Sequence, residues 1–288
     1  MVTTTPPIVR TIAQLRKQVA AARQAGHRVG LVPTMGALHA GHLSLVDAAA
    51  AECDFIIATI FVNPTQFGPN EDFTKYPRTL EADLAKLSQH RVDIVFVPET
   101  AEMYPTGSAT RVEVEGAARE WEGACRPGHF GGVATIVLKL FQIAQADVAY
   151  FGRKDLQQTR VIMQMVRDLN VPIEIRVCPT LREPDGLAMS SRNVYLSPEE
   201  RRAALVLSRS LNLAQDLVGK GERSAARVLA AMQKLLATEP SVRVEYVAVV
   251  DPVTLATVEQ IKGGAYAIIA ARVGATRLID NEPLGDIS

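Results

Sequence analysis

The chain contains five short apolar runs, each followed by an amphipathic stretch or a turn. This pattern limits the folds that the chain can adopt. The runs cover residues 28–34, 55–64, 92–100, 148–155 and 173–180. Their apolar character is continuous rather than alternating, which is typical of strands in a parallel sheet that is covered on both faces. Amphipathic stretches such as residues 79–90 and 156–169 are long enough to form crossover helices. The pattern predicts a doubly wound, Rossmann-like α/β domain with a parallel sheet.

The pattern changes after about residue 185. Two helical stretches at roughly 198–217 and 222–238 come before two runs, 242–251 and 263–274, that alternate as half-exposed strands do. The loop before them contains Pro184, Asp185 and Gly186, a composition typical of a hinge. We therefore expect a Rossmann-like domain over residues 1–185 and a smaller C-terminal α+β domain over residues 186–288.

Charge and cysteine content limit the kinds of partner that the chain can bind and the compartment in which it works. Lys plus Arg and Asp plus Glu both number 31, so no net field attracts nucleic acid or acidic lipid. Cys53, Cys125 and Cys178 are widely spaced and form no C-x-x-C motif, which indicates buried free thiols in a reducing compartment. No apolar run approaches the length of a membrane span. The expectation is a cytoplasmic protein that binds neither nucleic acid nor membrane.

The stretch "PTMGALHAGH" places His39 and His42 where a predicted strand passes into a helix. Three interpretations compete for this pair: a metal site, ordinary core residues, or donors to a phosphate. A metal pair would need a third ligand, and only Asp47 is near in sequence. Free N–H groups and the positive end of the helix dipole attract phosphate, and Gly41 lets a ligand approach the backbone. The phosphate interpretation is therefore favoured.

H-x-G-H after such a strand resembles the signature of the superfamily of nucleotidyltransferases and class I aminoacyl-tRNA synthetases. Its usual companion is a second phosphate-binding loop of the K-M-S-K-S type, and "AMSSRN" at 188–193 is similar to that loop. Four longer motifs, "PTMGALHAGH", "FVNPTQFGPNEDFTKYPRT", "FGRKDLQQ" and "DGLAMSSRNVYLS", together resemble the pantothenate synthetase family over nearly the whole chain.

The resemblance implies an ATP-dependent ligase that joins pantoate to β-alanine through an enzyme-bound pantoyl adenylate, releasing AMP and pyrophosphate. It further implies magnesium and a homodimer. In such a family the first domain would bind nucleotide and pantoate, and the C-terminal domain would act as a lid. The first step needs no protein nucleophile, because the pantoate carboxylate itself attacks the α-phosphate.

The resemblance also assigns site residues. It makes His42 the catalytic histidine, with His39, Lys154 and Arg192 as further donors to the phosphates. The implied ATP site comprises Met35, Gly36, His39, Gly41, His42, Gly152, Lys154, Asp155, Leu181, Met189, Ser190, Ser191 and Arg192. The implied substrate residues are Gln66 and Gln158 for pantoate and Asn63 for the β-alanine side, with His129 as either a binding residue or part of a structural turn. No metal ligand is assigned. Asp155 could support magnesium, orient Lys154, or serve as an ordinary helix-start carboxylate.

One position departs from the family, in which the matching text is usually F-G-E-K-D. Here the middle residue is Arg153, a reversal of charge beside Lys154. If this side chain points to solvent, as strand alternation would suggest, little should change. If it points inward, the affinity for ATP should rise.

Three other functions share parts of this sequence pattern. A nucleotide transferase of the same superfamily would share both phosphate loops but would not need "NPTQFGPNEDF" or "KDLQQ". A tRNA synthetase is disfavoured by the short, neutral chain, because tRNA binding needs a basic surface. A sensor without catalysis would have no reason to keep Lys154, both histidines and Arg192.

Overall fold

The computed structural model describes residues 5–69 and 71–287, which form two compact units. The first unit contains the chain up to Gly152 together with Gln158–Cys178. The second contains Arg153–Gln157 and the chain from Pro179 onward. The division therefore does not follow chain order, because a short segment after the fifth strand belongs to the second unit. The domain boundary at residues 185 and 186 stays a prediction.

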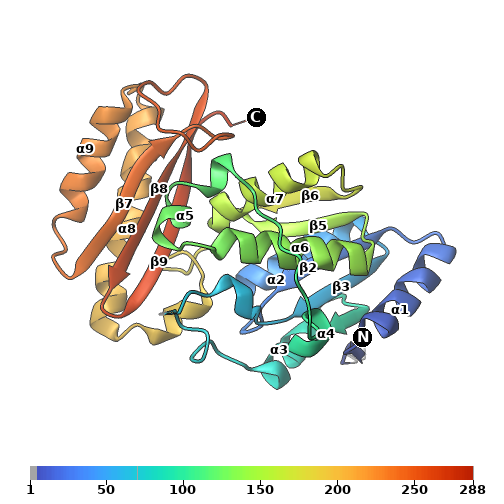
Figure 1. The fold of residues 1–288 in the computed structure, drawn as a ribbon. Coiled ribbons are helices and arrows are strands. Elements are labelled where there is room, and N and C mark those ends of the chain that lie inside the picture. The colour runs from blue at the N-terminus through green and yellow to red at the C-terminus, as the bar shows by residue number, and fades with distance from the viewer. Residues whose placement is uncertain (1–4, 70, 288) are drawn as a thin grey trace. The chain divides into compact units, whose positions relative to one another are not determined.

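A six-stranded parallel sheet forms the centre of the first unit (Figure 1). Its strands are β1 (Ile8–Val9), β2 (Val29–Thr34), β3 (Phe55–Ile60), β4 (Ile94–Phe96), β5 (Val148–Gly152) and β6 (Glu174–Cys178), in the order β1-β4-β3-β2-β5-β6. All pairs of neighbouring strands are parallel. The predicted parallel sheet is confirmed.

Helices pack on both faces of this sheet. The helices of the first unit are α1 (Ile12–Gln24), α2 (Ala40–Glu52), α3 (Leu80–Leu87), α4 (Thr100–Met103), α5 (Glu122–Cys125), α6 (His129–Ala144) and α7 (Leu156–Asp168), of which α7 begins in the segment assigned to the second unit. One buried cluster joins α1, α6 and α7 to Leu31 and Ile57, and another joins α2 and α3 to Val32 and Ile56. Because successive strand residues face opposite sides, the sheet is doubly wound as predicted.

The strand order reverses between β2 and β5. These strands are neighbours, with Gly30 opposite Val148 and Leu31 opposite Ala149. From β2 the chain proceeds through β3 and β4 toward one edge, and from β5 it proceeds to β6 at the other. In open α/β sheets ligands bind outside the carboxyl ends of the strands at such a switch point. The carboxyl ends of β2 and β5 are therefore the places to search for a site.

The second unit contains an antiparallel sheet and two long helices. Its elements are α8 (Pro198–Gly219), α9 (Ala225–Leu236), β7 (Val242–Val250), β8 (Gly264–Val273) and β9 (Thr276–Gly285), with the strands in the order β7-β8-β9. The predicted α+β character is confirmed. Ser197 caps α8 and forms a capping box with Glu200, and Pro198 occupies the first turn. The apolar faces of both helices share one core with the sheet.

Several element limits differ from the prediction. The run 55–64 is a strand only to Ile60, because Asn63 caps the 3-10 helix η1 (Pro64–Gln66). The run 148–155 ends as a strand at Gly152, where η3 (Arg153–Asp155) begins. In 92–100 only β4 is a strand, and Thr100 already begins α4. The sequence analysis did not predict β1, α1 or β9. β1 is very short, and β9 contains Asp280, Asn281 and Glu282, which are unusual in a strand.

Candidate active site

The turn after β2 is fixed by backbone geometry. Gly36 has φ +82° and Ala37 has φ +49°, so the chain reverses direction here in the left-handed region. A Cβ atom at Gly36 would lie 3.0 Å from Ile60 Cγ2 and 3.1 Å from Asp83 Oδ2. The turn therefore requires glycine at position 36 both for its conformation and for close packing.

A buried carboxylate from α3 holds this turn. Asp83 is 0% exposed and accepts hydrogen bonds from Ala37 N–H at 2.9 Å and Leu38 N–H at 2.7 Å. The Thr79 hydroxyl donates to the same carboxylate at 3.2 Å, and Lys86 donates to the Leu38 carbonyl. The sequence analysis missed this support. A carboxylate at the core-facing position of an amphipathic helix was the available signal.

The two histidines begin α2. His39 is the residue before the helix, His42 is in its first turn, and their ring centroids are 4.0 Å apart. His39 N–H lies 3.4 Å from His42 Nδ1, which therefore acts as an acceptor. The proton of a neutral His42 ring is then on Nε2, where it can be donated to a ligand. No acidic residue lies in the first turn of α2, so this helix start suits an anion.

Gln66 and Asn63 lie together after β3. Asn63 is 1% exposed, and its Nδ2 donates to Gln66 Oε1 and to Gly132 O, both at 3.1 Å. Its Oδ1 accepts from the Tyr104 hydroxyl at 2.9 Å. Gln66 lies in a 3-10 helix rather than at a strand end, and its Nε2 donates to Met35 Sδ at 2.9 Å. Asn63 thus fixes the carboxamide of Gln66.

His129 supports Gln66 from the other side. Its Nδ1 is 2.8 Å from the Gln66 carbonyl, and its Nε2 is 3.0 Å from Arg126. Arg126 forms a bidentate pair with Glu71 at 2.7 and 2.6 Å. Burial, assisted by the charge of Arg126, lowers the pKa of His129 from 6.5 to about 4. The ring is therefore neutral, donating through Nδ1 and accepting at Nε2. Arg126 and Glu71 had no local sequence signal.

Close packing of α6 against η1 depends on a glycine. A Cβ atom at Gly132 would lie 2.3 Å from the Thr65 carbonyl oxygen. The same approach lets Gly132 accept a hydrogen bond from Asn63. The "RPGHFGG" stretch is therefore a structural support of the Gln66 region, and the second glycine after His129 is part of it.

The segment after β5 carries the predicted phosphate-binding lysine. Gly152 ends the strand, and Arg153, Lys154 and Asp155 form the 3-10 turn η3. Lys154 Nζ is 3.7 Å from Asp155 Oδ1, with side-chain exposures of 20% and 48%. Gln158 is half-buried in the first turn of α7. Strand alternation therefore does not decide where Arg153 points, because this residue lies in a helical turn.

A tight hairpin leads into the second predicted phosphate loop. Arg182 pairs with Ala188 in an isolated bridge, and Met189 N–H donates to the Leu181 carbonyl at 3.0 Å. Ser190 caps the 3-10 helix η4 (Ser191–Tyr195) by accepting from Arg192 N–H at 3.3 Å. The buried Asn193 donates to the Ala188 carbonyl at 3.1 Å. The Met189–Arg192 loop is thus held by backbone and side-chain hydrogen bonds within residues 181–193.

The residues that the resemblance assigns to the site come from both units. The first unit holds Met35, Gly36, His39, Gly41, His42, Asn63, Gln66, His129, Gly152 and Gln158. The second unit holds Lys154, Asp155, Leu181, Met189, Ser190, Ser191 and Arg192. In the first unit, polar contacts join His39 to His42 and join Gln66 to Asn63, Met35 and His129. In the second unit, Lys154 lies beside Asp155, and Leu181 is bonded to Met189.

The sheet is open and doubly wound, and its strand order reverses between β2 and β5. A histidine-bearing turn follows β2, and a lysine-bearing segment follows β5. These features are those of a nucleotide-dependent α/β enzyme. The family model described as pantoate-beta-alanine ligase matches residues 7–283. The chain therefore belongs to the pantoate-beta-alanine ligase family.

Individual relatives agree. A pantothenate synthetase of Acidobacterium capsulatum is 60% identical over 258 residues, which cover 90% of this chain and 86% of the relative. The crystal structure of pantothenate synthetase from Thermus thermophilus superposes with a TM-score of 0.92 at 50% identity, covering 96% of this chain and 98% of that one. A pantoate-beta-alanine ligase from Francisella tularensis, complexed with beta-gamma ATP and beta-alanine, has a TM-score of 0.79 at 34% identity, covering 96% and 97%.

Proposed function

We propose that this chain catalyses the ATP-dependent condensation of pantoate with β-alanine to pantothenate in two steps. The pantoate carboxylate attacks the α-phosphate of ATP, forming enzyme-bound pantoyl adenylate and pyrophosphate. The β-alanine amine then displaces AMP. One observation carries the proposal: the H-x-G-H turn and the Lys154 segment follow β2 and β5, where the strand order reverses. The ligands of the Francisella relative support ATP and β-alanine as substrates.

The first step needs donors and cations rather than a protein base. His42 donates from Nε2 to the phosphates as pyrophosphate leaves, and this role is supported by the Nδ1 contact to His39 N–H. His39, Lys154 and Arg192 add donors or positive charge. The ATP-binding set is Met35, Gly36, His39, Gly41, His42, Gly152, Lys154, Asp155, Leu181, Met189, Ser190, Ser191 and Arg192. With the predicted domain boundary at residues 185 and 186, the residues before 186 bind nucleotide and pantoate, and residues 186–288 act as a lid.

Pantoate is a small anion with two hydroxyl groups, which neutral amide side chains can bind. Gln66 and Gln158 take this role. The Nε2 of Gln66 donates to a thioether, which is a weak acceptor, so a substrate hydroxyl can replace that contact. Asn63 is bonded to Gln66 and fully enclosed, and this favours an indirect influence on the β-alanine side. His129 acts through its bond to the Gln66 carbonyl.

Magnesium would be held mainly by the triphosphate. The described residues, 5–69 and 71–287, contain no cluster of three His, Cys, Asp or Glu that could hold a metal alone. Magnesium commonly binds one or two carboxylates plus substrate phosphates, and the half-exposed Asp155 beside Lys154 fits that donor set. When bound, the ion would neutralise charge on the leaving pyrophosphate. Asp155 would otherwise orient Lys154.

The enzyme would work as a homodimer in the cytoplasm without nucleic acid or membrane. The edge strand β6 and the exposed Met163 and Leu169 on the α7 side support a subunit contact there in the first unit. The expected burial of the three free cysteines holds for Cys53 but is wrong for Cys125, which is exposed, and for Cys178, which is half-buried. Free thiols still suit a reducing compartment. Among the described helices, none combines the length and apolar composition of a membrane span.

Pyrophosphate release with substrates withheld tests the mechanism. ATP and pantoate alone should give a burst of pyrophosphate close to the number of active sites, and further turnover should wait for β-alanine. The site must keep water from the mixed anhydride for the adenylate to persist. Labelled pyrophosphate should exchange into ATP when pantoate is present without β-alanine, and ¹⁸O from the pantoate carboxylate should appear in AMP. Exchange that required β-alanine would contradict the adenylate.

A further inference from the structure

Three consecutive residues of β9 make an unusual set of contacts within the second unit. Asp280, Asn281 and Glu282 lie in the middle of this antiparallel strand, opposite Ile269, Ile268 and Ala267 of β8. Asp280 is 5% exposed and Asn281 is 3% exposed. Because successive strand residues face opposite sides, Asp280 and Glu282 share one face while Asn281 occupies the other. Buried polar residues in a strand need partners, and these have two different ones.

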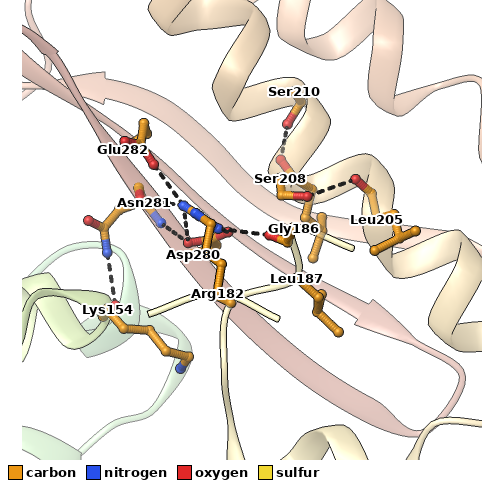
Figure 2. A network of polar contacts seen from close by, with 12 residues as sticks. Lys154, Arg182, Gly186, Leu187, Leu205, Ser208, Ser210, Asp280, Asn281 and Glu282 are labelled. Carbon is orange, nitrogen blue, oxygen red and sulfur yellow. Dashed lines mark hydrogen bonds and ion pairs between the residues drawn. The ribbon is translucent and has the colours of Figure 1, made fainter. Parts of the chain in front are cut away.

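Asn281 binds the segment that carries the predicted phosphate lysine. Its Nδ2 donates to the Arg153 carbonyl at 2.9 Å and to the Lys154 carbonyl at 2.8 Å. Carbonyl oxygens can only accept, so this contact fixes which end of the amide faces η3. Figure 2 shows the Lys154 side chain extending from the turn away from the Asn281 amide. The amide thus holds the lysine backbone, while the ammonium group lies 3.7 Å from Asp155 Oδ1.

The other face of the strand binds the hairpin before the second phosphate loop. Arg182 pairs with Asp280 at 2.6 Å and with Glu282 at 2.7 Å, and it donates to the Gly186 carbonyl at 3.3 Å (Figure 2). This largely buried network fixes the strand that presents Asn281. A charge network of this kind is costly to disturb, since removing one partner leaves another charge buried.

We propose that Asn281 is a positioning residue for Lys154 in the adenylation step. The inference rests on the proposed function, in which Lys154 contacts the phosphates. A lysine ammonium at the end of a flexible four-carbon stem is placed by its backbone, and small misplacements of reacting groups cost large factors in rate. The two carbonyl bonds fix that backbone from a strand more than a hundred residues later in the chain.

A double-mutant cycle tests the proposal in the full-length enzyme. Asn281→Ala should lower kcat for pantoate-dependent pyrophosphate release by about 10-fold. In a Lys154→Ala background the same substitution should cost less than about 2-fold, because the group it positions is gone. Asn281→Asp should be worse than Asn281→Ala, because a carboxylate would face two carbonyl oxygens. Asn281→Leu, which is similar in size and has no donor, replaces the alanine variant if that variant does not fold.

The matched control is Asn212→Ala on the exposed face of α8, which should leave kcat unchanged. Hydrogen exchange should quicken at residues 153–157 in Asn281→Ala and not in the control. Equal losses from Asn281→Ala with and without Lys154 would overturn the proposal, as would an unchanged kcat. The Lys154→Ala variant alone tests whether the lysine takes part in the reaction. Near-normal turnover in that variant would show that the proposed function, and not only the role of Asn281, is wrong.

Discussion

The turn before α2 and the turn before α7 follow neighbouring strands of one sheet, yet they are held in opposite ways. The first presents backbone N–H groups to the carboxylate of Asp83, which comes from α3 of the same unit. The second presents backbone carbonyls to the amide of Asn281, which comes from β9 and belongs, like η3, to the second unit. In each case the supporting side chain matches the polarity of the backbone that it meets.

In both turns the motif supplies the chemically active side chains, and the side chain that holds the turn in place comes from elsewhere in the chain. The H-x-G-H turn depends on a residue 45 or 46 positions away, and the lysine turn depends on one 127 or 128 positions away. Neither support belongs to the motif that it holds. Substitutions of motif and support should therefore differ in size and in kind.

His42→Ala should have the largest effect, because it removes a donor that acts in the transition state. We expect the adenylation rate to fall by about 100-fold or more, with the fold retained, as judged by circular dichroism. His42→Gln, which can place a donor near the position of Nε2, should retain more activity than His42→Asn, which can only reach the position of Nδ1. The reverse order would contradict the tautomer deduced from the His39 contact.

Asp83→Ala should have the next largest effect, since the half-buried N–H group of Ala37 and the buried N–H group of Leu38 lose their carboxylate. Each such group costs about 1–3 kcal/mol, so chemical unfolding should show a clear loss of stability. We also expect kcat to fall by about 10-fold through the displaced turn. Glu81→Ala on the exposed side of α3 is the control. A normal free energy of unfolding in Asp83→Ala would show that α3 does not stabilise the turn.

His129 provides a pH-dependent test of the support of Gln66. The folded chain lowers the pKa of His129 to about 4, while the unfolded chain keeps its ordinary value near 6.5. The stabilisation is therefore complete above pH 6.5 and is lost as the pH falls toward 4, by at most about 3 kcal/mol.

Unfolding free energies between pH 7 and 4.5 measure this loss. His129→Gln should be less stable than the parent at pH 7 but should lose less stability on acidification. His27→Gln, at an exposed position before β2, should follow the parent curve. Parallel curves for His129→Gln and the parent would show that this imidazole does not resist protonation on folding.

Arg153→Glu should have the smallest effect of the four. It restores the residue that is usual in the family at a half-buried position in η3, where the backbone rather than the side chain meets Asn281. Turnover should change by less than about 2-fold, as for most substitutions that break no specific contact. A large change in ATP affinity, measured by titration calorimetry, would place this side chain at the phosphates.

The sequence by itself determined the fold class and the chemistry of the motifs. Continuous apolar runs specify buried parallel strands, because burial on both faces leaves a local pattern. The expectation of two half-exposed strands after residue 240 was wrong for β8, in which eight of ten residues are buried, because β8 is the central strand of its sheet. The position of His39 and His42 at a helix start followed from the same local pattern. Predicted strand ends failed where a helical turn began, at Asn63 and Arg153, since apolar content does not distinguish the two.

Only the tertiary structure decided what holds those motifs in place. The bonds from Asp83, from His129 and Arg126, and from Asn281 all join residues far apart in sequence. A hydrogen bond of this kind depends on two groups being brought together by packing, and it leaves no periodic signal along the chain. The structure also assigned Arg153–Gln157 to the second unit, in which the Arg153 and Lys154 carbonyls accept hydrogen bonds from Asn281 of β9.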